Sequence, residues 1–207
     1  LLEFPPVIEK NILVAGTNSG DVFALDLPSG RLLWQVKVTG LVASSPAIRD
    51  GIAYVATTKG RLVAFDAATG RRLWRRQLGS SIESSPVLFA QGLYVGTLDG
   101  ELFKLDRRTG AITWRVKAPG PIKSAVAIWE KKVIVGDYAG HVSAYSRQNG
   151  VRLWATTSPG KRFRGPGRFY AGPAVSYGRV YIGNINSRVV ALQVDTGAIA
   201  WVFSAKE

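Results

Sequence analysis

Tryptophan recurs at a fixed interval along this chain of 207 residues. The first four repeated tryptophans are 40 residues apart and the fifth follows after 47; they are Trp34, Trp74, Trp114, Trp154 and Trp201. A glycine stands four residues before each of them, at Gly30, Gly70, Gly110, Gly150 and Gly197. Such a period is typical of repeat architectures, in which each unit packs against its neighbours. The spacing therefore predicts five successive units of one fold.

Each unit is predicted to contain four short strands separated by turns. In the second unit the strand-like stretches are 45–48, 52–56, 62–65 and 73–76, with glycine in every turn between them. The second stretch of a unit is apolar on both faces, whereas the fourth alternates between apolar and polar residues. This pattern predicts an all-β fold, a β-propeller of four-stranded antiparallel blades. The expected blades cover residues 6–45, 46–85, 86–125, 126–172 and 173–207.

A motif around the tryptophans resembles that of a known family. Residues 64–74 have the pattern A-x-D-x-x-T-G-x-x-L-W, which resembles the tryptophan-docking motif of the pyrroloquinoline quinone (PQQ) type propellers. The match recurs at 24–34 and 104–114 and weakens in the last two units, where Ser146 and Gln193 replace the aspartate. The resemblance covers essentially the whole chain. It implies a structural role for the five tryptophans and five glycines, with each indole buried between adjacent blades.

The number of blades leaves two arrangements open. Members of this family usually have about seven or eight blades, and this sequence holds five. The chain is either a segment of a larger propeller, which we favour, or a small five-bladed ring. It contains no methionine, and residues 1–6 lack the pattern of a signal peptide. We therefore expect a processed or excised piece of a longer protein.

Residues for catalysis are scarce. The resemblance implies that catalytic members of the family use a calcium-bound quinone, an acidic base and often a cysteine disulfide, and this chain has no cysteine. Most acidic residues lie at turns; the exception is Asp137, which stands where other units have threonine. The only histidine, His141, lacks the paired carboxylates of a metal site. We expect no catalytic residue, metal ligand or cofactor. PQQ with calcium belongs only to the alternative, a fragment of a PQQ-dependent alcohol or sugar dehydrogenase.

The main departure from the period is an insertion before the fifth unit. Seven extra residues fall within 158–170, a loop rich in glycine, proline, cations and aromatics. Loops held by a rigid scaffold often carry binding, and arginine and aromatic residues are favoured at interfaces. The predicted partner-binding residues are Lys161, Arg162, Phe163, Arg164, Arg168, Phe169 and Tyr170. The other interpretation is a solvated loop whose aromatics cover a blade edge.

The net charge of +13 favours anionic partners. No motif that reads RNA or DNA accompanies the cations, so nucleic-acid binding stays a hypothesis without motif support. No apolar stretch approaches the roughly 20 residues that span a bilayer, so we expect no transmembrane segment. The interpretation we favour is a non-catalytic scaffold that binds a protein or an anionic component of the cell envelope. The resemblance extends to the propeller subunit of the outer-membrane β-barrel assembly machinery, which implies an extracytoplasmic location.

Overall fold

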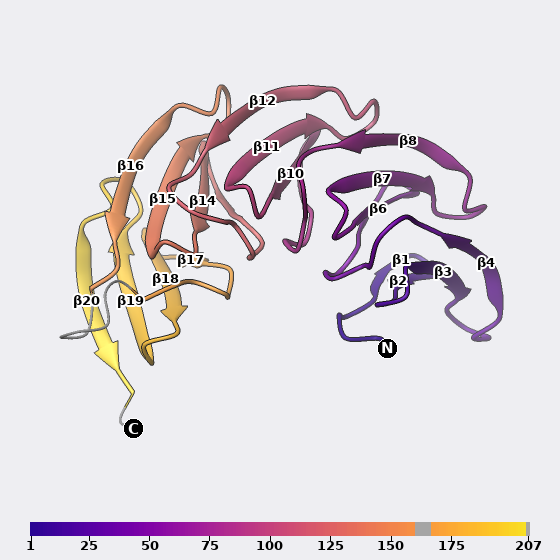
Figure 1. Ribbon diagram of the computed structural model, residues 1–207, viewed down its shortest axis with the longest axis horizontal. Helices are drawn as coiled ribbons and strands as arrows, with labels where there is room; N and C mark the ends of the chain where they lie inside the picture. Colours follow the sequence, from indigo (N-terminus) through magenta and orange to yellow (C-terminus); the bar gives the residue numbers. More distant parts are fainter. Residues whose placement is uncertain (160–166, 206–207) are drawn as a thin grey trace.

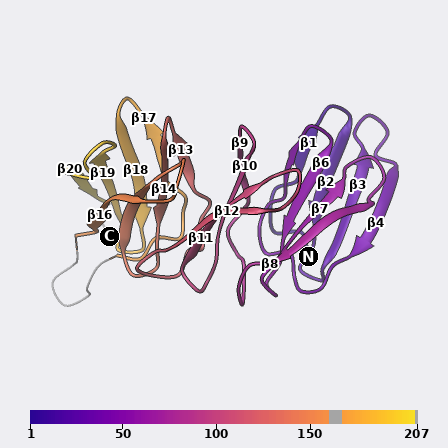
Figure 2. The same ribbon diagram turned by 90° about the horizontal axis from the view of Figure 1, so that it is seen from above.

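The computed structural model describes residues 1–159 and 167–205 and has the predicted all-β architecture. Its strands form five separate sheets, each of four consecutive antiparallel strands. Figure 1 shows these sheets as blades along an open arc, and Figure 2 shows them from above, side by side. The first and last blades lie at opposite ends of the arc. Of the two arrangements left open by the sequence, the structure shows the segment and not a closed five-bladed ring.

The four strand positions have similar lengths in every blade. The innermost strands are β1 (Val7–Glu9), β5 (Ala47–Arg49), β9 (Val87–Phe89), β13 (Ala127–Trp129) and β17 (Ala174–Ser176). The second strands are β2 (Ile12–Gly16), β6 (Ile52–Ala56), β10 (Gly92–Gly96), β14 (Lys132–Gly136) and β18 (Arg179–Asn184). The third strands are β3 (Asp21–Asp26), β7 (Arg61–Asp66), β11 (Glu101–Asp106), β15 (His141–Ser146) and β19 (Arg188–Gln193). The outermost strands are β4 (Leu32–Lys37), β8 (Arg72–Gln77), β12 (Ile112–Lys117), β16 (Arg152–Thr157) and β20 (Ile199–Ser204).

A tight turn joins the third and fourth strands of each blade. In the second blade the Asp66 carboxylate accepts hydrogen bonds from the backbone N–H groups of Ala68 and Thr69 and from the Thr69 hydroxyl, at 2.8–3.1 Å. Gly70 then adopts a φ of +72°, which suits a residue without a Cβ. A β-bulge follows, because the register between the two strands shifts after Ala64.

Adjacent blades are joined through the tryptophans. Four indole N–H groups donate to backbone carbonyl oxygens of the following blade at 2.8–3.2 Å: Trp34 to Ala67, Trp74 to Arg107, Trp114 to Arg147 and Trp154 to Val194. The glycine that faces each indole belongs to that following blade. A Cβ on Gly110, for example, would lie 2.7 Å from the Trp74 ring. The repeated glycine therefore makes room for the tryptophan of the unit before it.

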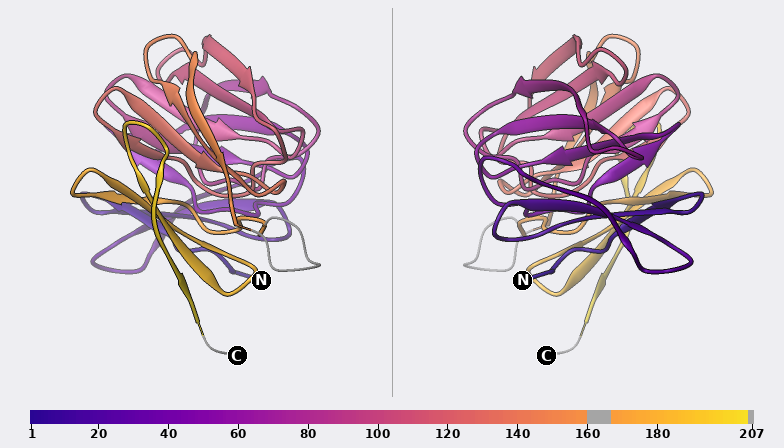
Figure 3. Two further views of the ribbon diagram at one scale, coloured as in Figure 1. Left: turned by 90° about the vertical axis from the view of Figure 1, so that its left-hand side faces the viewer. Right: turned by 90° about the vertical axis from the view of Figure 1, so that its right-hand side faces the viewer.

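The two ends of the arc lack this contact. Trp201, on β20 of the last blade, is 41% exposed, whereas the other four repeated tryptophans are 8–9% exposed. At the other end, a Cβ on Gly30 would meet no atom within 4 Å. Figure 3 looks onto each end in turn and shows no further sheet in front of the terminal blades. Within the described residues, Trp201 and Gly30 therefore do not join blades.

Candidate functional site

One face of the arc is built from connections between blades, and we call it the connector face. On this face, the segment after the outermost strand of each of the first four blades runs beside the turn between the second and third strands of the same blade. Four backbone N–H groups of these segments donate to that turn: Val42 to Thr17, Ile82 to Thr57, Ile122 to Thr97 and Phe169 to Asp137. These hydrogen bonds hold the backbones of the two segments side by side.

The insertion falls between β16 and β17, and its described end, residues 167–170, lies on this face. Lys161, Arg162, Phe163 and Arg164, four of the predicted contact residues, lie outside the described residues. Arg168, Phe169 and Tyr170 are described. Arg168 and Tyr170 are exposed, and Tyr170 is 55% exposed. The structure thus places these two where a partner can reach them.

Phe169 differs from its two neighbours and from the expectation that it contacts a partner. Its side chain is 0% exposed and belongs to the core cluster between the fourth and fifth blades. The reason is its register, since Phe169 takes the place that Val42, Ile82 and Ile122 take in the first three blades. Phe169 therefore anchors the end of the insertion to the blade beneath it.

Tyr170 is part of a cluster of aromatic rings and cations. Its ring packs edge-on against Tyr138, from the β14–β15 turn, with 4.6 Å between centroids and 75° between planes. Lys123 Nζ, from the β12–β13 connection, lies 5.1 Å from the Tyr138 ring centroid and 5.6 Å from that of Tyr170. The Arg168 guanidinium lies 5.4 Å from the Tyr138 ring centroid. These distances are within the range of cation–π attraction.

The cluster also contacts the connection between the second and third blades. Lys123 also forms an ion pair of 3.0 Å with Glu83, from the connection between β8 and β9. Lys123 and Glu83 are partly buried, with side-chain exposures of 28% and 32%. Aromatic rings offer apolar area at a small cost in conformational entropy, and arginine offers directed hydrogen bonds. The cluster formed by Lys123, Tyr138, Arg168 and Tyr170 is therefore suited to bind another protein.

Asp137 and His141 are brought together, and their arrangement is structural. Asp137 is 1% exposed, and its carboxylate accepts backbone N–H hydrogen bonds from Gly120, Ala139 and His141 at 2.9–3.2 Å. His141 Nδ1 lies 3.4 Å from the same carboxylate. In the third blade Thr97 accepts the corresponding bond from Glu101 through its hydroxyl. Asp137 thus holds the turn that carries Tyr138.

Two arginines lie at the blade interfaces, the buried Arg107 and the partly buried Arg147, and no sequence pattern singled them out. Arg107 is 2% exposed, and its guanidinium forms an ion pair with Asp50 of the preceding blade. Arg147 occupies the same position one blade later, and its guanidinium lies 4.6 Å from the Phe89 ring centroid. Burial and the nearby Arg147 charge lower the pKa of Lys104, whose ammonium donates to the Arg147 carbonyl oxygen at 3.0 Å. The signal in the sequence is an arginine directly after the aspartate position of the docking motif, where the second and fifth blades have the apolar residues Ala67 and Val194.

Over residues 1–159 and 167–205, no group of three or more histidine, aspartate or glutamate side chains is placed to hold a metal ion. In the same stretches no helix is long and apolar enough to cross a membrane.

Comparison with known proteins gives one family and a set of similar folds. The family model described as outer membrane protein assembly factor BamB matches residues 2–88 and 60–206. The BamB crystal structure from Moraxella catarrhalis is similar, with a TM-score of 0.85 at 19% identity over 98% of this chain and 62% of that one. The quinohemoprotein alcohol dehydrogenase of Comamonas testosteroni has a TM-score of 0.83 at 17% identity, over 100% of this chain and 43% of that one. The chain thus spans less than two thirds of either protein. Curated protein sequences gave no match.

Proposed function

Since this chain belongs to the family of the outer membrane protein assembly factor BamB, we propose that it is a non-catalytic propeller scaffold of the cell envelope. It acts outside the cytoplasm and holds a protein partner on its connector face. The single observation that carries this proposal is the cluster of Lys123, Tyr138, Arg168 and Tyr170 on that face. Binding there requires no cofactor.

The blade interfaces give the cluster a rigid base. Its residues come from three successive segments, the β12–β13 connection, the β14–β15 turn and the β16–β17 connection. Trp114 and Trp154 join the blades beneath these segments through indole N–H hydrogen bonds of 3.2 and 3.0 Å. A surface whose parts are already in place loses little conformational entropy on binding.

The competing function is that of a PQQ-dependent alcohol or sugar dehydrogenase. A structural neighbour of this class supports only the fold, because its identity to this chain is 17%. Calcium is bound by several oxygen ligands, and carboxylates usually supply part of them. Among the described residues, no group of three or more histidine, aspartate or glutamate side chains is placed to hold such an ion, so this part of the chain gives the dehydrogenase no support.

Site-specific photo-crosslinking in the source organism tests the proposal. A photoreactive residue at position 170 is expected to crosslink to one envelope protein, identified by mass spectrometry. The matched control is position 177, because Tyr177 is a tyrosine of 93% exposure in the β17–β18 turn. The crosslink from position 170 should disappear when Lys123→Glu is added, since reversing that charge removes the cation beside both rings.

Two results would contradict the proposal. Equal crosslinking from positions 170 and 177 would mean that the cluster has no preference for a partner. Reduction of an electron-accepting dye by the full-length protein with added PQQ, calcium and an alcohol or sugar would favour the dehydrogenase.

A further inference from the structure

A groove of about 200 Å³ lies between the first and second blades, away from the cluster on the connector face. One wall comes from the end of β4, with Val36, Lys37 and Val38. The other comes from β7 and β8, with Val63, Phe65 and three arginines. In Figure 1, β4, β7 and β8 lie next to one another near the N-terminal end of the arc.

The three arginines of this groove are Arg61, Arg72 and Arg75, and strand pairing puts them on one face. Arg75 lies opposite Val63, and Arg61 is two residues before Val63 on the same strand. Side chains two residues apart on a strand share a face, so Arg61 and Arg75 are diagonal neighbours. The bulge after Ala64 pairs Arg72 with Phe65 and brings it to this face as well.

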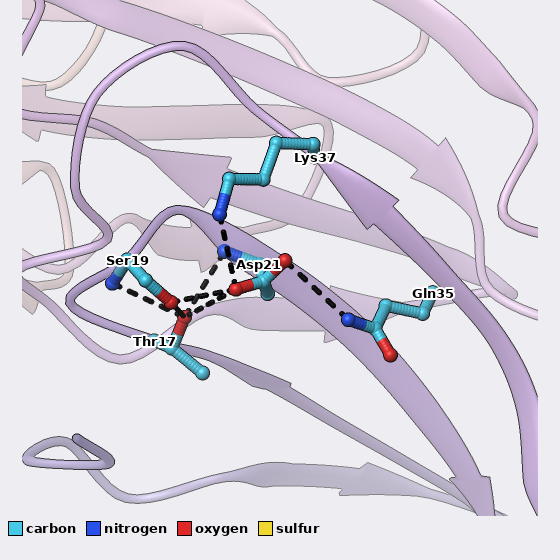
Figure 4. Close-up of polar contacts among 5 residues, drawn as sticks. All are labelled: Thr17, Ser19, Asp21, Gln35 and Lys37. Carbon is cyan, nitrogen blue, oxygen red and sulfur yellow. Dashed lines mark hydrogen bonds and ion pairs between the residues drawn. The ribbon is translucent and has the colours of Figure 1, made fainter.

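These three arginines form no ion pair with a carboxylate of the described residues. Lys37, the fourth cation of the groove, is held by Asp21 at 3.2 Å, and Asp21 also accepts from the Ser19 hydroxyl at 2.6 Å (Figure 4). No described carboxylate lies within ion-pair distance of Arg61, Arg72 or Arg75. Three positive charges therefore face the groove, and no acidic side chain in residues 1–159 and 167–205 pairs with them.

The next blade interface shows why the groove is open here. There Arg76 reaches across the interface and donates to the carbonyl oxygens of Gly110 and Thr109 at 2.8 and 3.1 Å. Val36 takes the place of Arg76 between the first and second blades, and its shorter side chain leaves that space free. The third blade has Glu101 and Ile112 at the positions of Arg61 and Arg72. The corresponding surface of that blade therefore carries fewer positive charges.

We infer that this groove binds an acidic peptide segment of a partner protein, with an apolar side chain between carboxylates. Guanidinium groups pair with carboxylates through directed, charge-assisted hydrogen bonds. Arg61 and Phe65, the β7 partner of Arg72, are four residues apart, which is about 13 Å of strand. The charges of Arg61 and Arg72 therefore match several carboxylates along a peptide better than one compact phosphate. Val36, Val38, Val63 and Phe65 supply the apolar floor for the intervening side chain.

Fluorescence anisotropy with synthetic peptides tests this site. The probe is a labelled peptide with one leucine flanked on each side by two glutamates, and its comparison has glutamine in place of glutamate. We expect Arg75→Gln and Arg61→Gln each to weaken binding of the acidic peptide about tenfold, the effect of one lost charge-assisted hydrogen bond. The matched control is Arg115→Gln, which makes the same charge change at the position of Arg75 one blade along; it should change the affinity less than about twofold.

Three outcomes would overturn the inference. Equal losses in Arg75→Gln and Arg115→Gln would mean that the peptide responds only to the net charge of +13. Equal binding of the glutamate and glutamine peptides would exclude recognition of carboxylates. Binding to vesicles of anionic phospholipid that is lost in Arg75→Gln, without binding of the peptide, would assign the groove to a lipid headgroup. None of these depends on the cluster around Tyr170, so the groove and the proposed function can fail separately.

Discussion

The buried guanidinium of Arg107, in the third blade, forms an ion pair with the carboxylate of Asp50, in the β5–β6 turn of the second blade. The Arg107 side chain is 3% exposed and that of Asp50 is 55% exposed. Arg107 Nε also donates to the carbonyl oxygen of Ala90 at 3.2 Å. The Arg107 side chain therefore connects two blades, and the Asp50 carboxylate balances its positive charge.

Replacing Asp50 with asparagine is expected to destabilise the protein by about 1–2 kcal/mol. The cost is less than the roughly 3–5 kcal/mol of a fully buried pair, because Asp50 is half exposed and water screens it. Asparagine also tolerates the φ of 52° at this position. Chemical denaturation measures the change, and Asp195→Asn is the control. Asp195 pairs with Lys132 at 2.7 Å but is 77% exposed, so its loss should cost less than about 0.5 kcal/mol. Equal effects of the two variants would contradict a special role for Arg107.

The repeated tryptophans are expected to differ in their contribution to stability. Trp114 is 8% exposed and bonded to the next blade, so Trp114→Ala should cost about 3–5 kcal/mol. Trp201 occupies the same motif position but is 41% exposed, so Trp201→Ala should cost about 1 kcal/mol or less. Thermal unfolding followed by circular dichroism compares them. A similar loss in both variants would mean that the indole stabilises its own blade and not the interface.

The fold was predictable because its signals are periodic. Tryptophan and glycine at a constant interval, and strands apolar on both faces, identify a propeller from the sequence. The buried Arg107 was not predictable in the same way, because it occupies a position where Ala67 stands in the preceding blade and arginine is seldom buried. The burial of Phe169 was hidden by the insertion, which separates it from Trp154 by 15 residues where Ile122 follows Trp114 by eight. The groove depends on Val36 and Arg75 meeting across two blades, and no local pattern shows that.

The protein is expected to lose stability as the pH rises above about 10. Burial raises the pKa of the Tyr54, Tyr94 and Tyr145 hydroxyls above the usual value of about 10. The folded chain therefore holds these protons more tightly than the unfolded chain does. The stability from this difference is complete below pH 10 and declines as the pH rises through the folded-state pKa. Tyr94→Phe should reduce the decline, and Tyr177→Phe, at an exposed position, should not. Alkaline unfolding curves with tyrosinate absorbance measure both.

Acid should act through Asp21. Hydrogen bonds from Ser19 and the ammonium of Lys37 lower the pKa of this carboxyl from 3.8 to about 2. A depressed pKa contributes stability that is present above the unfolded-state value and is lost as the pH falls from about 4 to about 2. Asp21→Asn should therefore lower the stability at neutral pH and flatten its dependence on pH in this range. If the wild type and the variant change in parallel between pH 4 and 2, Asp21 does not have this role.

Phe169 and Tyr170 are expected to separate packing from binding at adjacent positions. Phe169 is 0% exposed, and a Cβ added to Gly136 would lie 2.8 Å from the Cβ of Phe169. The space around the Phe169 side chain is therefore closely filled. Phe169→Ala should cost about 3–5 kcal/mol, because it leaves a cavity between the fourth and fifth blades. Tyr170→Ala should change stability by about 0.5–1 kcal/mol, since its 55% exposed ring loses mainly the contacts with Tyr138 and Lys123.

Urea denaturation measures the stability of the two variants. Crosslinking from a photoreactive residue at position 138 then measures binding of the partner. Tyr170→Ala should abolish that crosslink in a protein that remains folded. Unchanged crosslinking in Tyr170→Ala would show that Tyr170 takes no part in binding.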